Sequence, residues 1–477
     1  MKELFAACGM QYVFDRSAPV SPFGEALVRS LQPYTSQAEL SAERERLRVL
    51  LSYGNTAQLI RRLQLHLMQL KDIQGSLHAC EEGGVLSLIE LFELKLLLLH
   101  LQELKADYDA LCKLPGVEFL PVEEALSTLD PFGRKRQTFM LDDAATPALL
   151  NIRREKAAAD AELLGCADAK RRTEIRLRRT QLCEEERKEE QRIRADLSAA
   201  LAPHCKAVLS CCEAAGHLDW LLQKAEMVHR FGAVIPQTND SRIIMEGMFH
   251  PELSSYTEQR GEHFVPLNIT LPYGTTLIAG ANMGGKSVAL RTLMLNLLLA
   301  MTGCPVFAKH AELPMLTSLS MLFGDAENEA AGLSAFGGEV ERLRDALQAF
   351  NENGVLVLDE PARGTNPEEG AALVQSIAEY MNKKRGFTVI ASHYSGVSAC
   401  AAAVYKAGGL RADARQALQK LSDKTRLNAD HIAAQMCYGL TPAAAAEAET
   451  GAALTVCRLL GLPDELMDLA DEKMNGN

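Results

Sequence analysis

The hydrophobic positions of the first half of the chain recur at helical spacing. Leucines follow Ser36 at helical intervals, and Glu39 stands three residues after that serine, which is the spacing of a helix-capping box. The same pattern occupies residues 59–73 and 86–104, with few β-branched residues to interrupt it. The chain is therefore predicted to be almost entirely helical as far as about residue 231, after an irregular segment over residues 1–35.

A charged stretch lies within this helical region. Residues 152–197 have too few apolar positions to bury more than one stripe, which predicts a helical hairpin or coiled-coil arm with its tip near residues 165–168. Its basic side chains could contact nucleic-acid phosphates, or they could form a solvated face with internal i,i+4 ion pairs. The sequence leaves both interpretations open. The candidate nucleic-acid residues are Lys170, Arg171, Arg172, Arg176, Arg178 and Arg179.

Short apolar runs alternate with helical segments beyond Pro236. Strands are predicted at residues 276–279, 355–358 and 388–391, and helices at residues 289–300 and 370–381. Strands that alternate with helices indicate an α/β domain with a parallel sheet and helices on both faces.

A phosphate-binding loop follows the first of these strands. Residues 280–287 read GANMGGKS, which fits G-x-x-x-x-G-K-[ST] between a strand and a helix. The glycines let backbone N–H groups face phosphates, and the following helix presents its positive end to them. Lys286 is expected to contact the β- and γ-phosphates, and Ser287 a Mg²⁺ ion. The loop residues assigned to nucleotide binding are Gly280, Asn282, Met283, Gly284, Gly285, Lys286 and Ser287.

Acidic and histidine side chains follow the other two strands. Asp359 and Glu360 come directly after one buried strand, where doubly wound folds bind ligands. Asp359 is expected to hold Mg²⁺ through water, and Glu360 to orient or deprotonate the attacking water. His393 follows the third strand and could sense the terminal phosphate or polarise the water; the alternative is a histidine that simply ends a strand.

Composition limits the classes of partner. The chain has 477 residues, 47% of them hydrophobic, and a formal charge of −12, so no global positive field attracts nucleic acid or lipid. The twelve cysteines include no CxxC pair, and Glu90, Glu93 and Lys95 interrupt the most apolar stretch. We expect a reducing, cytoplasmic location, without a signal peptide or a membrane partner.

These motifs together resemble a known family. The segments GANMGGKS, LVLDEPARGTNPEEG and TVIASHY are similar to the ATPase core of the MutS family, which is related to ABC-type ATPases. The resemblance covers about residues 242–395. It implies an α/β P-loop ATPase domain with a doubly wound, mainly parallel sheet, preceded by a long helical lever and arm, and it implies ATP and Mg²⁺ as cofactors. It also assigns Phe264 to stacking on adenine.

A further segment resembles the signature loop of this family. Residues 332–339 carry Ser334, Phe336 and Glu339 at matching positions, but Leu333 replaces a usually basic residue. The resemblance implies a homodimer in which Ser334 reaches the γ-phosphate bound to the opposite subunit. Ser334 could instead be a helix N-cap alone.

The resemblance also suggests a division of the chain. We expect a helical lever region at residues 36–235 with an arm at about 152–197, an ATPase domain at 236–429, and a helical dimerisation element at 430–477. About 35 residues precede the first long helix, too few for the mismatch-reading and connector domains of family members that sense mismatches. A mismatch-blind clamp on duplex or branched DNA is the first hypothesis. The alternative is ATP-driven remodelling of a protein client, such as a cobalamin-dependent aminomutase.

Overall fold

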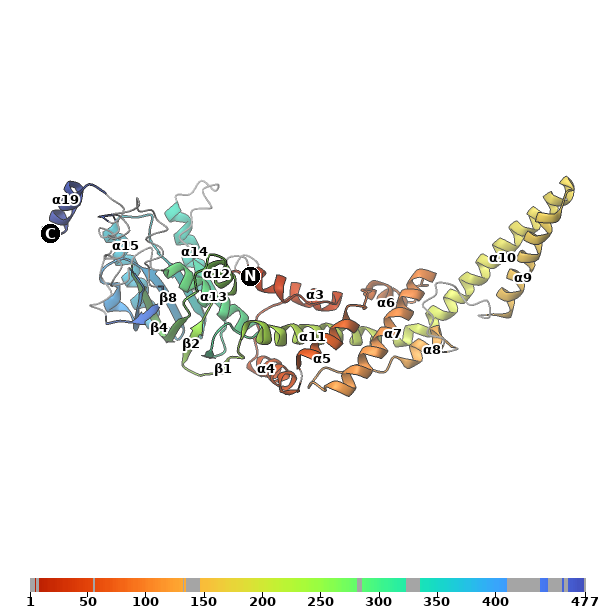
Figure 1. Cartoon of the computed structure of the whole chain (residues 1–477), viewed down its shortest axis with the longest axis horizontal. Coiled ribbons are helices and arrows are strands. Elements are labelled where there is room, and N and C mark those ends of the chain that lie inside the picture. The colour runs from red at the N-terminus through yellow and green to blue at the C-terminus, as the bar shows by residue number, and fades with distance from the viewer. Residues whose placement is uncertain are drawn as a thin grey trace. The chain divides into compact units, whose positions relative to one another are not determined.

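The structure is a computed structural model of the whole chain (Figure 1). It describes residues 5, 8–54, 56–131, 133, 146–280, 285–322, 335–409, 438–444, 457–458 and 462–475. The chain divides into two compact units. One comprises Ala18–Leu31 and Arg46–Glu226, and the other comprises Met1–Ser17, Gln32–Glu45 and Met227–Asn477.

The first unit is helical throughout its described part, as the hydrophobic pattern predicts. The helices that lie in it or enter it are α3 (Pro22–Arg29), α4 (Gln37–Ser52), α5 (Thr56–Leu67), α6 (Gln74–Glu81), α7 (Leu88–Leu111), α8 (Glu123–Leu129), α9 (Pro147–Gly165), α10 (Ala169–Leu201), η1 (Ala202–His204) and α11 (Cys205–Phe231). The pattern at residues 59–73 is not one helix, because α5 ends at Leu67. Leu70 and Ile73 are buried in the connection to α6, which explains why the apolar pattern continues there.

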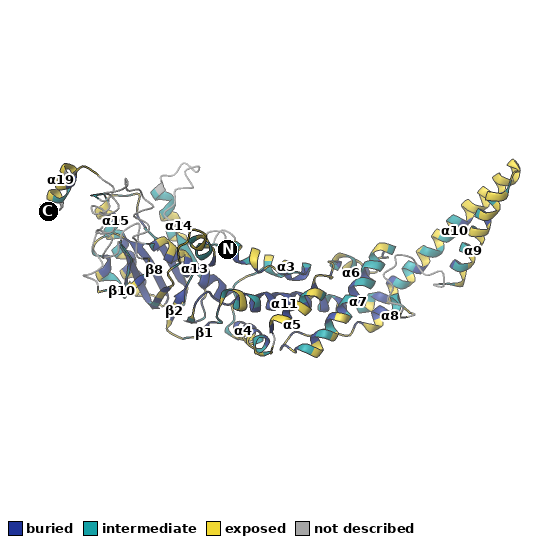
Figure 2. Ribbon diagram, in the orientation of Figure 1, coloured by how far each residue is buried: buried dark blue, intermediate teal, exposed yellow. Residues whose placement is uncertain are grey.

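Helices α9 and α10 form the predicted hairpin, and the turn between them falls at residues 166–168. Ala159, Ile175 and Leu182 form a narrow buried seam. Figure 2 shows most of the remaining surface of these helices as exposed. Ion pairs also join the two helices, with Arg153 Nε 3.0 Å from Glu186 Oε1.

The segment predicted to be irregular contains helices. Helix α3 forms because the Ser21 hydroxyl accepts a hydrogen bond from Gly24 N and Pro22 occupies the first helical turn. The carboxylate of Asp219, on α11, accepts hydrogen bonds from Val20 N at 2.9 Å and from Ser21 N at 2.7 Å. The other unit contributes α2 (Met10–Arg16), which buries Met10 and Val13. The prediction for residues 1–35 was therefore wrong, because caps and contacts distant in sequence order these short segments.

The second unit is built on two sheets. The larger has the order β10-β9-β4-β8-β7-β6, and its neighbours are parallel except for the pair β10–β9. Its strands are β4 (Gly274–Ala279), β6 (Leu319–Leu322), β7 (Val355–Asp359), β8 (Phe387–Ser392), β9 (Ala403–Ala407) and β10 (Leu440–Pro442). The smaller has the order β1-β5-β2-β3, from β1 (Gln237–Thr238), β2 (Arg242–Met248), β3 (Leu267–Pro272) and β5 (His310–Leu313).

Helices in this unit follow the strands. They are α12 (Pro251–Gln259), α13 (Lys286–Met301), α14 (Ala335–Ala349), α15 (Pro367–Asn382), η3 (Val397–Cys400) and α19 (Asp464–Asn475). All six residues of β4 and of β8 are buried, so both faces of the sheet are covered at these strands. The three predicted strands and two predicted helices are confirmed with slightly longer bounds.

The parallel register places the ends of three strands together. Ala279 of β4 pairs with Ser392 of β8, and Asp359 of β7 pairs with Ala391 of β8. The residues that follow these strands therefore meet at one edge of the sheet. Among the described residues, no helix is both long enough and apolar enough to span a membrane.

Candidate active site

The chain turns from β4 into α13 through glycines in unusual backbone conformations. Gly280 has φ +137 and Gly285 has φ +84, values that a residue with a Cβ adopts only under strain. A Cβ on Gly280 would also lie 3.2 Å from Ala407 O. Gly285 caps α13, which begins at Lys286. Asn282, Met283 and Gly284 lie outside the described residues.

The Lys286 side chain is buried at the start of α13. Its ammonium donates a hydrogen bond to Gly280 O at 2.6 Å and lies 3.3 Å from Glu360 Oε1. The positive end of α13 is adjacent, and both groups favour an anion at this point.

Asp359 is the last residue of β7 and lies opposite the start of α13. Its carboxylate is hydrogen-bonded to the Ser287 side chain, while its Oδ1 is buried without a hydrogen-bond partner among the described residues. Burial raises the pKa of Asp359, against the lowering effect of Ser287 and Lys286. A buried, unpartnered carboxylate oxygen beside a hydroxyl suits Mg²⁺, which prefers oxygen ligands. These residues fit a magnesium ion.

Glu360 lies at the centre of a charged cluster. Its carboxylate oxygens lie 3.3 Å from Lys286 Nζ, 3.6 Å from Arg363 Nε and 3.8 Å from His393 Nδ1. The Glu360 backbone has φ +51, and its N–H donates to Ala391 O at 2.9 Å. The parallel pairing of β7 and β8 thus brings Glu360 and His393 together, as the sequence predicts. A carboxylate held in this way can orient a water molecule or accept its proton.

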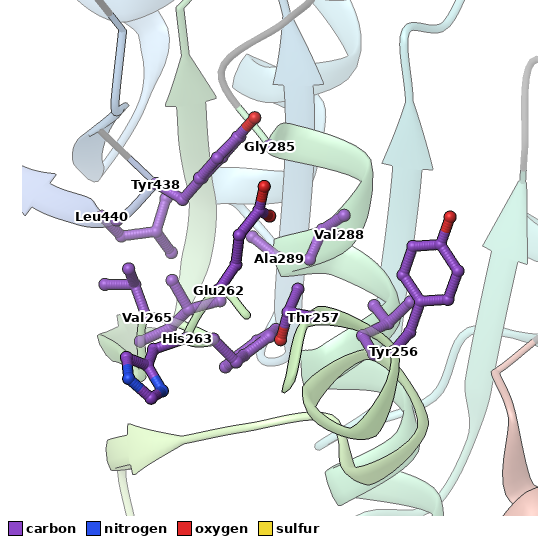
Figure 3. Close-up of a pocket in the computed structure, with 14 residues that line it drawn as sticks. Tyr256, Thr257, Glu262, His263, Val265, Gly285, Val288, Ala289, Tyr438 and Leu440 are labelled. Atoms are coloured by element: carbon purple, nitrogen blue, oxygen red, sulfur yellow. The ribbon is translucent and has the colours of Figure 1, made fainter. Parts of the chain in front are cut away.

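An apolar cavity of about 300 Å³ adjoins Gly285, the residue of the predicted phosphate loop that precedes α13 (Figure 3). Its walls include Phe264, Val288 and Ala289, together with Gly285 of the loop itself. Tyr438 closes another side and approaches Gly285, since a Cβ there would lie 3.4 Å from the tyrosine ring. Apolar walls of this kind can accommodate a flat ring system.

Tyr438 could not be found from the sequence. It stands more than 150 residues from the phosphate loop and belongs to no local motif. It reaches the cavity because it precedes β10, which pairs with β9, and β9 pairs with β4. Phe264 lies in the cavity wall, and its stacking on adenine stays a prediction.

The remaining candidate residues are Ser334 and the six basic residues of the arm. Ser334 is outside the described residues, immediately before α14. The six basic candidates are on α10 in the helical unit. Three of them form ion pairs across the hairpin: Arg171 with Glu162, Arg178 with Glu155 and Arg179 with Asp160. The other three, Lys170, Arg172 and Arg176, make no ion pair with any described residue.

Comparison with known proteins gives a family match within the unit that carries the two sheets, and several relatives. Residues 276–476 match the protein family MutS domain V. The chain is 31% identical over 228 residues to endonuclease MutS2 of Levilactobacillus brevis, a match that covers 47% of this chain and 28% of that protein. It is 32% identical over 213 residues to DNA mismatch repair protein MutS of Thermus aquaticus, covering 45% of this chain and 26% of that protein. Endonuclease MutS2 of Streptococcus thermophilus is 30% identical over 222 residues, with 46% and 28% covered. The matched part thus spans little more than a quarter of each relative.

The buried carboxylate of Asp359 gives a prediction about stability. Because burial disfavours its charged form, we expect Asp359→Asn to stabilise the metal-free protein by roughly 0.5–2 kcal/mol. The same variant loses a carboxylate ligand, so MgADP should raise its unfolding midpoint less than that of the wild type. Thermal unfolding with and without MgADP measures both effects. Asp345→Asn, at an exposed position of α14, is the control. A destabilised Asp359→Asn protein with a full response to MgADP would contradict the metal assignment.

Proposed function

Because the chain belongs to the MutS family, we propose that it is an ATPase that binds ATP with Mg²⁺ and hydrolyses it to ADP and phosphate. One observation carries this proposal: Lys286, Asp359 and Glu360 converge at the edge of the parallel sheet, beside the apolar cavity. The activity is a proposal because the matches span only 26–28% of the relatives.

Each part of the site has a role in this proposal. The adenine base lies in the cavity against Phe264 and Tyr438, which offer flat apolar faces. The phosphates lie against the loop and the N-terminus of α13, where Lys286 supplies a positive charge. Ser287 and Asp359 hold the Mg²⁺ ion, which neutralises charge on the phosphates when bound.

Glu360 and His393 act on the attacking water. Glu360 accepts a proton of this water as its oxygen bonds to the γ-phosphorus and the bond to the β-phosphate oxygen breaks. In the present structure the Glu360 carboxylate forms an ion pair with Lys286. Phosphates that attract Lys286 would leave this carboxylate available to the water. In this proposal His393, whose Nδ1 lies 3.8 Å from Glu360 Oε1, contacts the terminal phosphate or the same water.

We further propose a homodimer with composite sites. Ser334 directly precedes α14, so the positive end of that helix and the serine hydroxyl could together contact the γ-phosphate on the partner subunit. Helix α19 supports self-association, because it exposes Leu466 and Leu469. It lies in the predicted helical dimerisation element 430–477, but β10, within the same range, is a strand that pairs with β9 of the larger sheet. Nucleotide binding at the dimer interface would then change the position of the helical levers.

DNA is the partner that we propose for the levers. The names of the relatives refer to DNA mismatch repair and to an endonuclease. Residues 169–180 of α10 carry six basic side chains and one acidic side chain, Glu174. Because Lys170, Arg172 and Arg176 form no ion pair with described residues, they are the side chains best able to neutralise phosphates. The contact is expected to be independent of sequence and blind to mismatches.

A protein client is the second candidate. It is favoured by the net charge of −12 and by the ion pairs of Arg171, Arg178 and Arg179, which already neutralise half of the basic candidates. In that case the same ATPase would remodel a protein, such as the cobalamin-dependent aminomutase named among the hypotheses above, and would have no role on DNA.

The ATPase proposal predicts different defects for two variants. Lys286→Ala should abolish nucleotide binding and turnover, because it removes the charge that faces the phosphates. Glu360→Gln should retain binding but lose roughly 10²–10⁴-fold in hydrolysis, because an amide cannot accept the proton. Fluorescent ATP binding and phosphate release measure the two steps separately.

The control for these variants is Glu352→Gln, at an exposed position before β7. It should bind and hydrolyse ATP as the wild type does. Hydrolysis at the wild-type rate by Glu360→Gln would show that the water is activated by another group.

The composite site predicts complementation between damaged subunits. Ser334→Ala and Lys286→Ala proteins should each be inactive, yet a heterodimer of the two has one intact site. An equal mixture should therefore recover up to about a quarter of the wild-type activity, if dimers form at random. Phosphate release after subunit exchange is the measurement. Proven exchange without recovered activity would argue against delivery of Ser334 to the partner's site.

The DNA proposal predicts binding that depends on salt and not on mismatches. Affinities for a matched duplex and for a duplex with one mispair should differ less than about tenfold, equal to roughly 1.4 kcal/mol. Neutralising Lys170, Arg172 and Arg176 should weaken binding and reduce the number of counterions released on binding by roughly three for each arm that contacts the DNA. The matched control neutralises the ion-paired Arg171, Arg178 and Arg179, and should have a smaller effect.

Two outcomes of the DNA measurement would change this assignment. A mispair preference above tenfold would contradict a mismatch-blind clamp. No binding to either duplex at low salt would favour the protein client.

A further inference from the structure

The loop after β7 contains a residue with a strained backbone, Ala362, whose N–H and carbonyl groups are both hydrogen-bonded to side chains. Ala362 is buried and has φ +64, a left-handed conformation that is unfavourable for a residue with a Cβ. Its N–H donates to Glu339 Oε1 at 2.7 Å, and its carbonyl accepts a hydrogen bond from the Tyr394 hydroxyl at 2.9 Å. Such a conformation persists only when the surrounding structure fixes it.

The first contact comes from α14. Glu339 lies in the second turn of this helix, and Phe336 of the first turn packs against the same loop. A Cβ on Gly364 would lie 3.3 Å from Phe336 Cβ, so the start of α14 and the loop are in close contact. Helix α14 therefore cannot move away without breaking the hydrogen bond to Ala362.

The second contact comes from the segment after β8. Tyr394 follows His393, and the two rings stack with their centres 4.9 Å apart. The Tyr394 hydroxyl reaches Ala362 only because residue 370 is glycine: a Cβ there would lie 2.7 Å from the hydroxyl oxygen. Burial raises the pKa of Tyr394, and the charges of Glu339 and Glu360 add to this effect, so the hydroxyl remains a donor.

We propose that Glu339 and Tyr394 are positioning residues that clamp the Ala362 peptide and thereby fix the carboxylate of Glu360 for hydrolysis. Glu360 stands two residues before Ala362 and is itself left-handed, with φ +51. Only Pro361 separates them, and its ring restricts its own φ angle. A change in the Ala362 backbone must therefore redirect Glu360.

This arrangement connects three parts of the site. The helix that follows Ser334, the segment that carries His393 and the loop that carries Glu360 all meet at one peptide. The inference rests on the proposed ATPase function and adds a form of regulation to it. A displacement of α14 within the same chain would be transmitted to the general base through Glu339.

The test separates catalysis from nucleotide binding. Glu339→Ala should lower kcat about tenfold, while KM for ATP changes less than about twofold, because the lost contact affects the water-activating group and not the phosphate loop. Glu339→Gln keeps an oxygen acceptor and should retain most of the activity. Tyr394→Phe, which keeps the ring and removes the hydroxyl, should also lower kcat with little change in KM. Glu341→Ala and Tyr380→Phe, at exposed positions of α14 and α15, are the matched controls.

A second-site change distinguishes positioning from general damage to the fold. Glycine adopts a positive φ without the steric cost of a Cβ. Ala362→Gly should therefore restore part of the kcat lost in Glu339→Ala, which it would not do if Glu339 only stabilised α14. Hydrogen exchange of the 361–365 segment without nucleotide provides a readout that needs no turnover. The amide of Ala362 should exchange faster in Glu339→Ala than in Glu339→Gln.

The outcomes separate this inference from the function on which it rests. Wild-type hydrolysis together with unchanged kcat in Glu339→Ala and Tyr394→Phe overturns the clamp and leaves the ATPase intact. A parallel rise in KM, or no recovery with Ala362→Gly, also counts against positioning. Wild-type protein that neither binds nor hydrolyses ATP overturns the proposed function, and the catalytic role of the clamp with it.

Discussion

The in-register parallel pairing of β4, β8 and β7 is the constraint on which the candidate site depends. Because Ala279 pairs with Ser392 and Asp359 pairs with Ala391, the residues that follow each strand share one edge of the sheet. Both faces of β4 and β8 are buried, so a shift in register would disturb apolar packing along the whole strand. The apolar core therefore fixes the relative positions of the polar residues that follow these strands.

Those polar groups are arranged at a cost to stability. Asp359 carries a buried oxygen without a partner among the described residues, and Glu360 and Ala362 are both left-handed. Desolvation and backbone strain of this kind concentrate at functional sites and persist where the surrounding packing is strong. Here that packing comes from α15, whose Val374 and Ala378 lie in one apolar cluster with β4, β7 and β8. The polar residues of the site thus provide its chemistry, while the apolar residues behind them provide the stability of the sheet.

The helical unit follows a different principle. Leucines form its core, whereas the hairpin of α9 and α10 has only a narrow buried seam and gains further support from ion pairs between the helices. Exposed ion pairs contribute little to stability, so their arginines remain exchangeable with other anions. Only some of the basic side chains of the arm are therefore neutralised by acidic side chains of the same chain. The surface of the arm is compatible with a nucleic-acid partner and with a protein partner.

The sequence by itself determined the elements and the chemistry that depend on local pattern. Short apolar runs predict β4, β7 and β8, and the motif at residues 280–287 and the pair Asp359–Glu360 need only neighbouring residues to be recognised. Only the tertiary structure decided the contacts between distant groups that do not follow neighbouring parallel strands. It brings Tyr438 to the cavity and directs Glu339 and Tyr394 to the Ala362 peptide. It also pairs three of the six basic candidates of the arm with acids on the facing helix. It also orders the segment before Ser36 as helices through contacts such as that of Asp219 with Ser21. The physical reason is that these contacts join residues tens to hundreds of positions apart, and their geometry follows from packing and register, which local spacing does not encode.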